Sequence, residues 1–245
     1  GSGAFLNEAV NQIADRILEL EMGEGVGALK SPQDKQKRLY EIKYQLVSNN
    51  VYGVDLNPTA IELARFSLWL NCIGAAKEPP QFKGKFKVGN SLIGARFKKG
   101  ADGIYPWLLL DDRMMNYGNR LQDYAPEGAK TIQEFRTNLL NSKINPGDQG
   151  ICQIQHLAEM ALAQLHSEAN HDECTAYARL KLCADLWCSL FFLTPDKIKH
   201  FPPSHAQYLN VIFSILKNEI SDEHKNLIES VTELTQRERF FHWDL

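Results

Sequence analysis

The first five residues, Gly1-Ser2-Gly3-Ala4-Phe5, form a glycine-rich stretch directly before a segment with the hydrophobic period of a helix. Glycine lets backbone N–H groups approach a ligand closely and adopts positive φ at little steric cost. The N-terminus of the helix that follows favours electronegative groups on a ligand. This stretch could therefore bind the polar end of a cofactor, although a glycine pair that opens a helix is often only a turn.

Polar residues also follow two short apolar segments, "VYGVDL" and "KFKVGNSLIG", which are typical of strands. Asp55 lies at the end of the first segment, and its carboxylate could accept both ribose hydroxyls of an adenosyl group. Asn90-Ser91-Leu92 lies at the end of the second. Because ligands of open α/β sheets bind outside the carboxyl ends of the strands, we expect these residues and the glycine stretch to face one crevice.

The helices and strands around these residues can be predicted from the hydrophobic pattern and the turn residues. The pattern predicts a helix over 5–21, a loop over 22–35, a helix over 36–48, a strand within 49–56, a helix that begins at Asn57-Pro58, and a strand within 85–94. This order fits a parallel sheet with crossover helices.

The rest of the chain has a different character. Residues 95–130 hold clusters of Gly, Pro and Asp and are predicted to be irregular. The capping-box pairs Thr131/Glu134 and Ser204/Gln207 predict two helix starts, the second helix running to about residue 219. Apolar stripes predict further helices over 153–167, 176–193 and 222–238, and we expect these stripes to form a core. We therefore predict an α/β chain in which a partial parallel sheet is followed by a mainly helical segment.

Composition excludes several classes of protein. The net charge of −3 argues against a chain that binds nucleic acid through an overall basic surface. The five cysteines are odd in number and form no CxxC pair, so we predict a reducing cytoplasm and no metal site. The longest strongly apolar stretch, 186–193, is far shorter than the roughly 20 residues of a membrane helix, so we predict no membrane partner.

One local cluster of basic side chains stands out against this acidic balance. Its members are Lys77, Lys83, Lys85, Lys87, Arg96, Lys98 and Lys99. Charge runs of this kind usually form a solvated rim, which is the interpretation we favour.

The spacing of the candidate residues argues against a dinucleotide site. Gly3 and Asp55 are 52 residues apart, whereas about 20 residues separate the glycine motif and the acidic residue of a dinucleotide-binding fold. Leu6 also stands where the third glycine of a G-x-G-x-x-G motif would be. An NAD-dependent dehydrogenase therefore fits poorly.

Three stretches, "GSGAFLNEA", "NNVYGVDLNPTAIELARFSLWL" and "VGNSLIG", resemble the cofactor-binding motifs of adenine-specific (N6) DNA methyltransferases. The likeness is greatest to the large methylases of type IIG restriction-modification and of phage-defence systems such as BREX and DISARM. Two later stretches, "CADLWCSLFF" and "RFFHWDL", resemble the helical insertion ahead of the catalytic motif of that group. The resemblance covers most of the chain, thinly over 95–150. It implies a partial Rossmann-like methyltransferase domain over 1–94, an irregular connection over 95–130 and a helical insertion over 131–245.

The resemblance also implies a cofactor, S-adenosylmethionine, and a set of residues that bind it. These are Gly1, Ser2, Gly3, Phe5, Asp55, Leu56, Asn90 and Ser91. The glycine stretch and Phe5 would line the methionine side of the cofactor. Asp55 would hold the ribose hydroxyls, with Leu56 against the adenine ring. Asn90 would lie near the adenine amino group, where many methyltransferases have an aspartate, and its amide oxygen can still accept from an N–H donor.

In the same family a segment like "FFHWDL" precedes a catalytic Asn-Pro-Pro-aromatic motif, which grips the amino group of a base flipped from the duplex. The sequence holds no such motif, and "FPPSH" (201–205) is predicted as a helix start. We therefore expect an internal piece of a longer enzyme that methylates adenine N6 in double-stranded DNA, in restriction-modification or phage defence. The chain alone would supply cofactor-binding residues and would not itself methylate DNA, and none of its residues is assigned as catalytic.

Two alternatives stay open at this point. In the first, the helical part is a non-catalytic interaction module on a methyltransferase remnant that binds no cofactor. The motifs through residue 94 serve the cofactor and not the substrate, so a methyltransferase for RNA or a small molecule is the other alternative.

Overall fold

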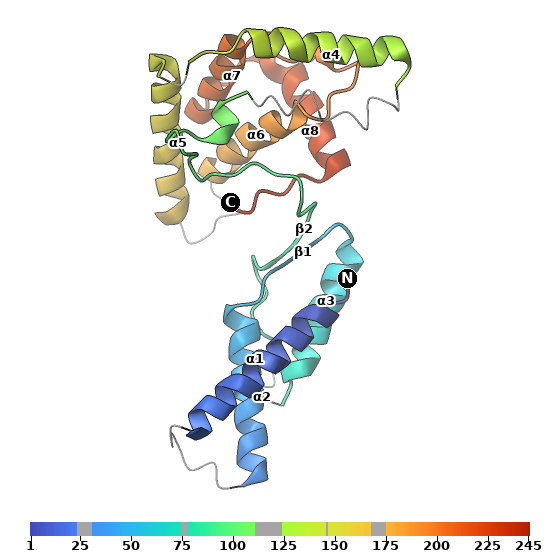
Figure 1. Ribbon diagram of the computed structural model, residues 1–245, viewed down its shortest axis with the longest axis vertical. Helices are drawn as coiled ribbons and strands as arrows, with labels where there is room; N and C mark the ends of the chain where they lie inside the picture. The colour runs from blue at the N-terminus through green and yellow to red at the C-terminus, as the bar shows by residue number, and fades with distance from the viewer. Residues whose placement is uncertain (24–30, 75–77, 111–123, 146, 168–174) are drawn as a thin grey trace. The chain divides into compact units, whose positions relative to one another are not determined.

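The computed structural model describes residues 1–23, 31–74, 78–110, 124–145, 147–167 and 175–245 (Figure 1). The chain divides into two compact units, Gly1–Asn90 and Ser91–Leu245. Most described residues are helical, and a small parallel sheet lies in the first unit. None of the described helices is both long and apolar enough to cross a membrane.

The first unit consists of three helices and two short strands. In chain order these are α1 (Ala4–Gly23), α2 (Pro32–Asn49), β1 (Gly53–Asp55), α3 (Pro58–Cys72) and β2 (Phe86–Val88). The strands pair in parallel with Asp55 opposite Val88, and α3 connects them. The predicted parallel sheet with a crossover helix is thereby confirmed, although each strand is only three residues long.

Local capping explains where the helices of this unit begin. Asn57 caps α3, because its side-chain oxygen accepts from the backbone N–H of Thr59 at 2.9 Å, and Pro58 takes the first helical position, as predicted. α2 begins at Pro32, four residues before the predicted start at 36. A capping box that the sequence analysis missed explains the difference: the Ser31 hydroxyl and the Asp34 carboxylate each bond the backbone N–H of the other.

A small apolar core holds the first unit together. Its buried members come from α1, α2, α3 and β2: Val10, Val47, Ile61, Ala64, Leu68, Cys72 and Phe86. The core thus fixes α1 and α3 against the sheet, and these are the elements that carry the glycine stretch and flank Asp55.

The second unit is a packed set of helices. It contains α4 (Pro126–Asn141), α5 (Gln149–Ser167), α6 (Thr175–Ser189), α7 (His205–Lys217) and α8 (Lys225–Glu238), with short 3₁₀ turns at Pro106–Leu108, Ile198–His200 and Asp222–His224. Ser204 caps α7, and its hydroxyl accepts from the backbone N–H of Gln207, so that predicted helix start is confirmed. The apolar stripes form the predicted core, and the segment before α4 contributes buried Phe97 and Trp107 to it.

The other predicted capping box is wrong. α4 begins at Pro126 and not at Thr131, because proline fits the first helical position and Glu127 follows it in the first turn. Thr131 lies inside the helix, where its hydroxyl donates to the carbonyl of Glu127 at 2.8 Å. Residues 111–123 of the segment predicted to be irregular lie outside the described residues.

Candidate functional site

A hollow of about 380 Å³ lies beside the glycine stretch in the first unit. Five of the predicted cofactor residues line it: Gly1, Ser2, Gly3, Phe5 and Asp55. Its remaining walls come from the first turn of α1, from β1, from the inner face of α3 and from Phe86. The structure therefore brings together two motifs that the sequence separates by about fifty residues.

Gly3 turns the chain from the hollow into α1. It has a positive φ of 79°, and a Cβ there would lie 3.1 Å from the Cβ of Ala64 on α3. Both observations favour glycine, since other residues adopt this backbone conformation at a cost. The Gly3 carbonyl accepts from the N–H of Asn7 at 2.9 Å, which starts the helical hydrogen bonds of α1. The N–H groups of the first turn have no partner within a helix and are suited to an electronegative ligand.

Gly53 plays a comparable part in β1. A Cβ at this position would lie 2.9 Å from the ring of Phe86 on the paired strand. Its absence lets the buried Phe86 ring pack directly against β1 and form part of the wall of the hollow. The hollow thus depends on two close approaches, one at Gly3 and one at Gly53.

Asp55 supplies the only carboxylate among the residues that line this hollow. Its Oδ1 accepts from the backbone N–H of Asn57 at 2.8 Å, and its Oδ2 accepts from the amino group of Gly1. The Gly1 amino group, followed by the Asn57 N–H, holds the pKa of this carboxyl below its usual range. Asp55 is therefore charged at neutral pH and can accept hydrogen bonds from ligand hydroxyls.

The remaining three predicted residues do not line the hollow. Leu56 directly follows Asp55 and is half exposed. Asn90 follows Gly89, whose N–H donates to the carbonyl of Asp55 at 3.0 Å, so the ends of β1 and β2 lie side by side as predicted. Ser91 begins the second unit, where its carbonyl accepts from the indole N–H of Trp243 at 3.0 Å.

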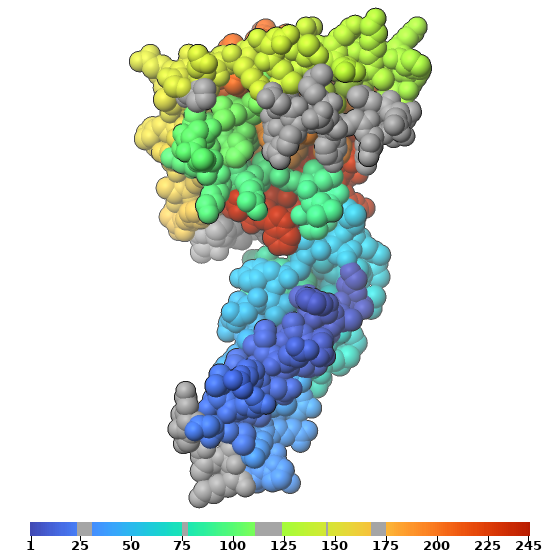
Figure 2. All heavy atoms as spheres, viewed as in Figure 1, coloured from blue at the N-terminus to red at the C-terminus, as the bar shows by residue number. Residues whose placement is uncertain are grey.

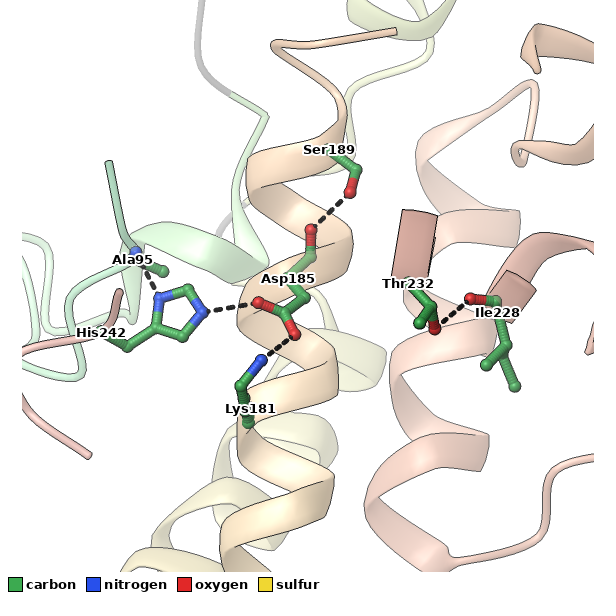
Figure 3. Close-up of polar contacts among 7 residues, drawn as sticks. All are labelled: Ala95, Lys181, Asp185, Ser189, Ile228, Thr232 and His242. Atoms are coloured by element: carbon green, nitrogen blue, oxygen red, sulfur yellow. Dashed lines mark hydrogen bonds and ion pairs between the residues drawn. The ribbon is translucent and has the colours of Figure 1, made fainter. Parts of the chain in front are cut away.

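The second unit contains a buried polar junction that the sequence analysis did not predict (Figure 3). Nδ1 of His242 accepts from the backbone N–H of Ala95 at 2.9 Å, so the ring proton lies on Nε2, which faces Oδ1 of Asp185 at 2.9 Å. Lys181 pairs with the other oxygen of this carboxylate. Asp185 and His242 are both buried, and their interaction joins "CADLWCSLFF" to "RFFHWDL". An acidic residue directly between two apolar residues of the buried stripe, Ala184 and Leu186, is the signal that could have indicated such a pair.

Gly94 allows the C-terminal segment to pack against the segment that follows β2. A Cβ at Gly94 would overlap the carbonyl oxygen of Phe241. On either side of it, the Phe241 N–H donates to the Ile93 carbonyl at 2.8 Å, and the Phe97 N–H donates to the Asp244 carboxylate at 2.7 Å. Figure 2 shows the green segment after residue 90 and the red C-terminal segment side by side on one face of this unit.

The predicted basic cluster is divided between the units. Lys83, Lys85 and Lys87 belong to the first unit and Arg96, Lys98 and Lys99 to the second, while Lys77 lies outside the described residues. Lys99 pairs with Glu159. Arg96 and Lys98 are exposed, as the interpretation of a solvated rim predicts.

Comparisons with known proteins agree on one class of enzyme. Residues 49–244 match the Eco57I restriction-modification methylase family. The matched range includes Asp55 and Asn90 and leaves the glycine stretch outside it. A protein of Methanocaldococcus jannaschii, named provisionally as a type II restriction enzyme and methyltransferase, is 34% identical over 113 residues, which cover 37% of this chain and 9% of that protein. No solved structure matches the chain.

Proposed function

The chain belongs to the Eco57I restriction-modification methylase family, and from that premise we propose that its first unit binds S-adenosylmethionine for the methylation of adenine N6 in double-stranded DNA. In this proposal the first unit is part of a Rossmann-like methyltransferase domain, and its two strands are part of the central sheet of that domain. The observation that carries it is the hollow shared by the glycine stretch and Asp55. Its walls include Gly3 and Gly53, where a Cβ would collide with Ala64 and Phe86 respectively.

Each wall of this hollow suits a different part of the cofactor. The first turn of α1 offers backbone N–H groups to the methionine carboxylate, and the exposed ring of Phe5 packs along the methionine chain. Asp55 accepts hydrogen bonds from the ribose hydroxyls. The volume of about 380 Å³ lies within the roughly 300–1,000 Å³ of small-molecule sites. The bound cofactor supplies a methyl group on a sulfonium centre.

The adenine end of the cofactor lies, in this proposal, beyond the ends of β1 and β2. Leu56 packs on the adenine ring, and Asn90 and Ser91 lie at its amino edge. The pairing of Asp55 with Val88 and the bond from Gly89 to Asp55 support this assignment, since they bring both strand ends to the same edge of the sheet.

Two observations support adenine in DNA as the target of methylation. One is the family, and the other is the resemblance of "CADLWCSLFF" and "RFFHWDL" to the helical insertion of adenine-specific DNA methyltransferases. The test is to express the complete reading frame that includes these residues in a host without DNA methylation and to analyse the nucleosides of its DNA. We expect N6-methyladenine, lost in Asp55→Ala and retained in Asp15→Ala, an exposed control on α1. N4-methylcytosine instead would overturn the adenine assignment, and methylated RNA with unmodified DNA would overturn the substrate.

A further inference from the structure

A second hollow, of about 420 Å³, lies entirely within the second unit and has no part in the cofactor site. One wall is the C-terminal end of α6 and the residues after it, with Trp187, Phe191 and Phe192. The facing wall is the segment that follows β2, with Leu92, Ile93 and Arg96. The hollow is therefore mainly aromatic on one side and carries a cation on the other.

The aromatic wall is held in place by its own contacts. The rings of Trp187 and Phe191 lie 4.9 Å apart in an edge-to-face arrangement, and the Trp187 indole N–H donates to the carbonyl of Leu109 at 3.1 Å. Phe192 is buried against Phe240, with ring centroids 5.5 Å apart. Flat, fixed rings of this kind stack well on planar aromatic ligands.

The facing wall is also fixed, by the polar junction described above. The Ala95 N–H donates a hydrogen bond to His242, and the absence of a Cβ at Gly94 allows the C-terminal segment to lie directly against this wall. Leu92 extends from this wall with 91% of its surface exposed. A hollow with both walls held by buried contacts is formed before any ligand arrives, which lowers the cost of binding.

The charge at this hollow favours an anionic ligand. Arg96 is exposed and has no hydrogen-bond or ion-pair partner among the described residues. None of the residues that line the hollow is acidic. A nucleotide has both features that such a hollow can bind, because its planar base can stack on the aromatic wall and its phosphate can contact the exposed Arg96 guanidinium.

We propose that this hollow binds one nucleobase of the DNA substrate, which stacks on Phe191 and Trp187 while Arg96 contacts the adjacent phosphate. The choice of DNA over other aromatic anions rests on the function proposed above. The site is one of substrate contact, and it requires no catalytic group in the second unit.

The test uses the full chain and an eight-nucleotide single-stranded oligodeoxynucleotide that carries 5-iododeoxyuridine at its centre. Ultraviolet cross-linking followed by peptide mapping should place the cross-link within residues 187–192. Binding measured by fluorescence anisotropy should weaken about ten-fold in Phe191→Leu, which keeps an apolar side chain and removes the stacking face. Arg96→Gln should weaken binding a few-fold and lower the salt dependence by about one phosphate contact.

Matched controls come from the same unit. Phe213 on α7 is half-buried like Phe191 and has a lysine ammonium, that of Lys217, 4.9 Å from its ring centroid, so Phe213→Leu should leave binding within two-fold of the unchanged chain. Lys199→Gln removes an exposed positive charge elsewhere and is the control for Arg96→Gln. Thermal unfolding of each variant establishes that it is folded. If Phe191→Leu does not fold, the test rests on Arg96→Gln, which changes an exposed side chain.

Three results would overturn the proposal: cross-links that map elsewhere, equal binding by the hollow variants and their controls, or no binding of the oligonucleotide. S-adenosylmethionine binding, measured on the same proteins, separates the two claims. Cofactor binding with no contact of DNA at 187–192 would defeat this inference alone. DNA contact at 187–192 without cofactor binding would defeat the cofactor site alone.

Discussion

Nε2 of His242 donates a hydrogen bond to the buried carboxylate of Asp185 at 2.9 Å, although the two residues are 57 positions apart in the chain. Through the other ring nitrogen, His242 also accepts from Ala95 (Figure 3). One imidazole therefore ties α6, the C-terminal segment and the segment after β2 together. Two of these, the end of α6 and the segment after β2, line the proposed nucleobase hollow.

Breaking this junction should cost more stability than breaking a surface ion pair. Asp185→Ala and His242→Ala each leave a buried polar partner unsatisfied, so we expect each to lower the free energy of unfolding by about 2–4 kcal/mol. A double-mutant cycle measured by urea unfolding should give a coupling energy of about 1–3 kcal/mol. The pair Lys197/Glu233, with an exposed carboxylate, is the control and should give about 1 kcal/mol or less. Equal coupling in both cycles would contradict the account.

Gly94 should tolerate no side chain. Gly94→Ala places a methyl group on the carbonyl of Phe241, so we expect a loss of about 1–3 kcal/mol or more in the free energy of unfolding, as in overpacked cores. Gly147→Ala, where a Cβ would meet nothing within 4 Å, should change it by no more than about 0.5 kcal/mol. If denaturant titrations show similar values for the two variants, the C-terminal segment does not lie against Gly94.

The buried thiols should make the chain less stable at alkaline pH. Burial raises the pKa of the thiols of Cys183 and Cys188 on α6, and it raises that of Cys72 on α3 to about 11. In the unfolded chain these thiols lose their protons near pH 8.5. The raised folded pKa therefore contributes stability that is fully present below about pH 8.5 and is lost as the pH rises, by up to about 1.4 kcal/mol per pH unit for each thiol.

Denaturant titrations between pH 7 and 10 measure this slope. We expect Cys183→Ala to reduce the slope, and Cys152→Ala, which removes an exposed thiol, to leave it unchanged. An unchanged slope in Cys183→Ala would mean that this thiol is accessible to water.

What the sequence predicts well in this fold is local. Asn57-Pro58 marks the start of α3 because the cap and the proline act within three residues of each other. The predicted start of α4 is wrong because the Thr131/Glu134 pattern resembles a capping box. The helix begins five residues earlier at Pro126, which fits the first helical position. Here two local signals compete, and the proline with the acid that follows it, and not the cap-like pair, marks the start of the helix.

The candidate site shows the same division. The glycine stretch and Asp55 could be placed in one crevice because strand ends of a parallel sheet share an edge. Whether Leu56 and Asn90 face that crevice depends on contacts that no short motif encodes. The hydrogen bond between Asp185 and His242 is likewise a long-range contact, and only the acid between the apolar residues of the buried stripe of α6 could have indicated it.

Isothermal titration calorimetry of the chain with S-adenosylmethionine shows whether the first unit binds this cofactor. We expect saturable binding that weakens about ten- to a hundred-fold in Asp55→Ala, since hydrogen bonds to a charged group contribute about 1.5–3 kcal/mol. Asp15→Ala should bind like the unchanged chain, and a cofactor concentration of 100 times Kd should raise the free energy of unfolding by about 2.7 kcal/mol. No binding would contradict the cofactor site and favour a methyltransferase remnant with an interaction role, and equal binding by all three proteins would contradict the role of Asp55.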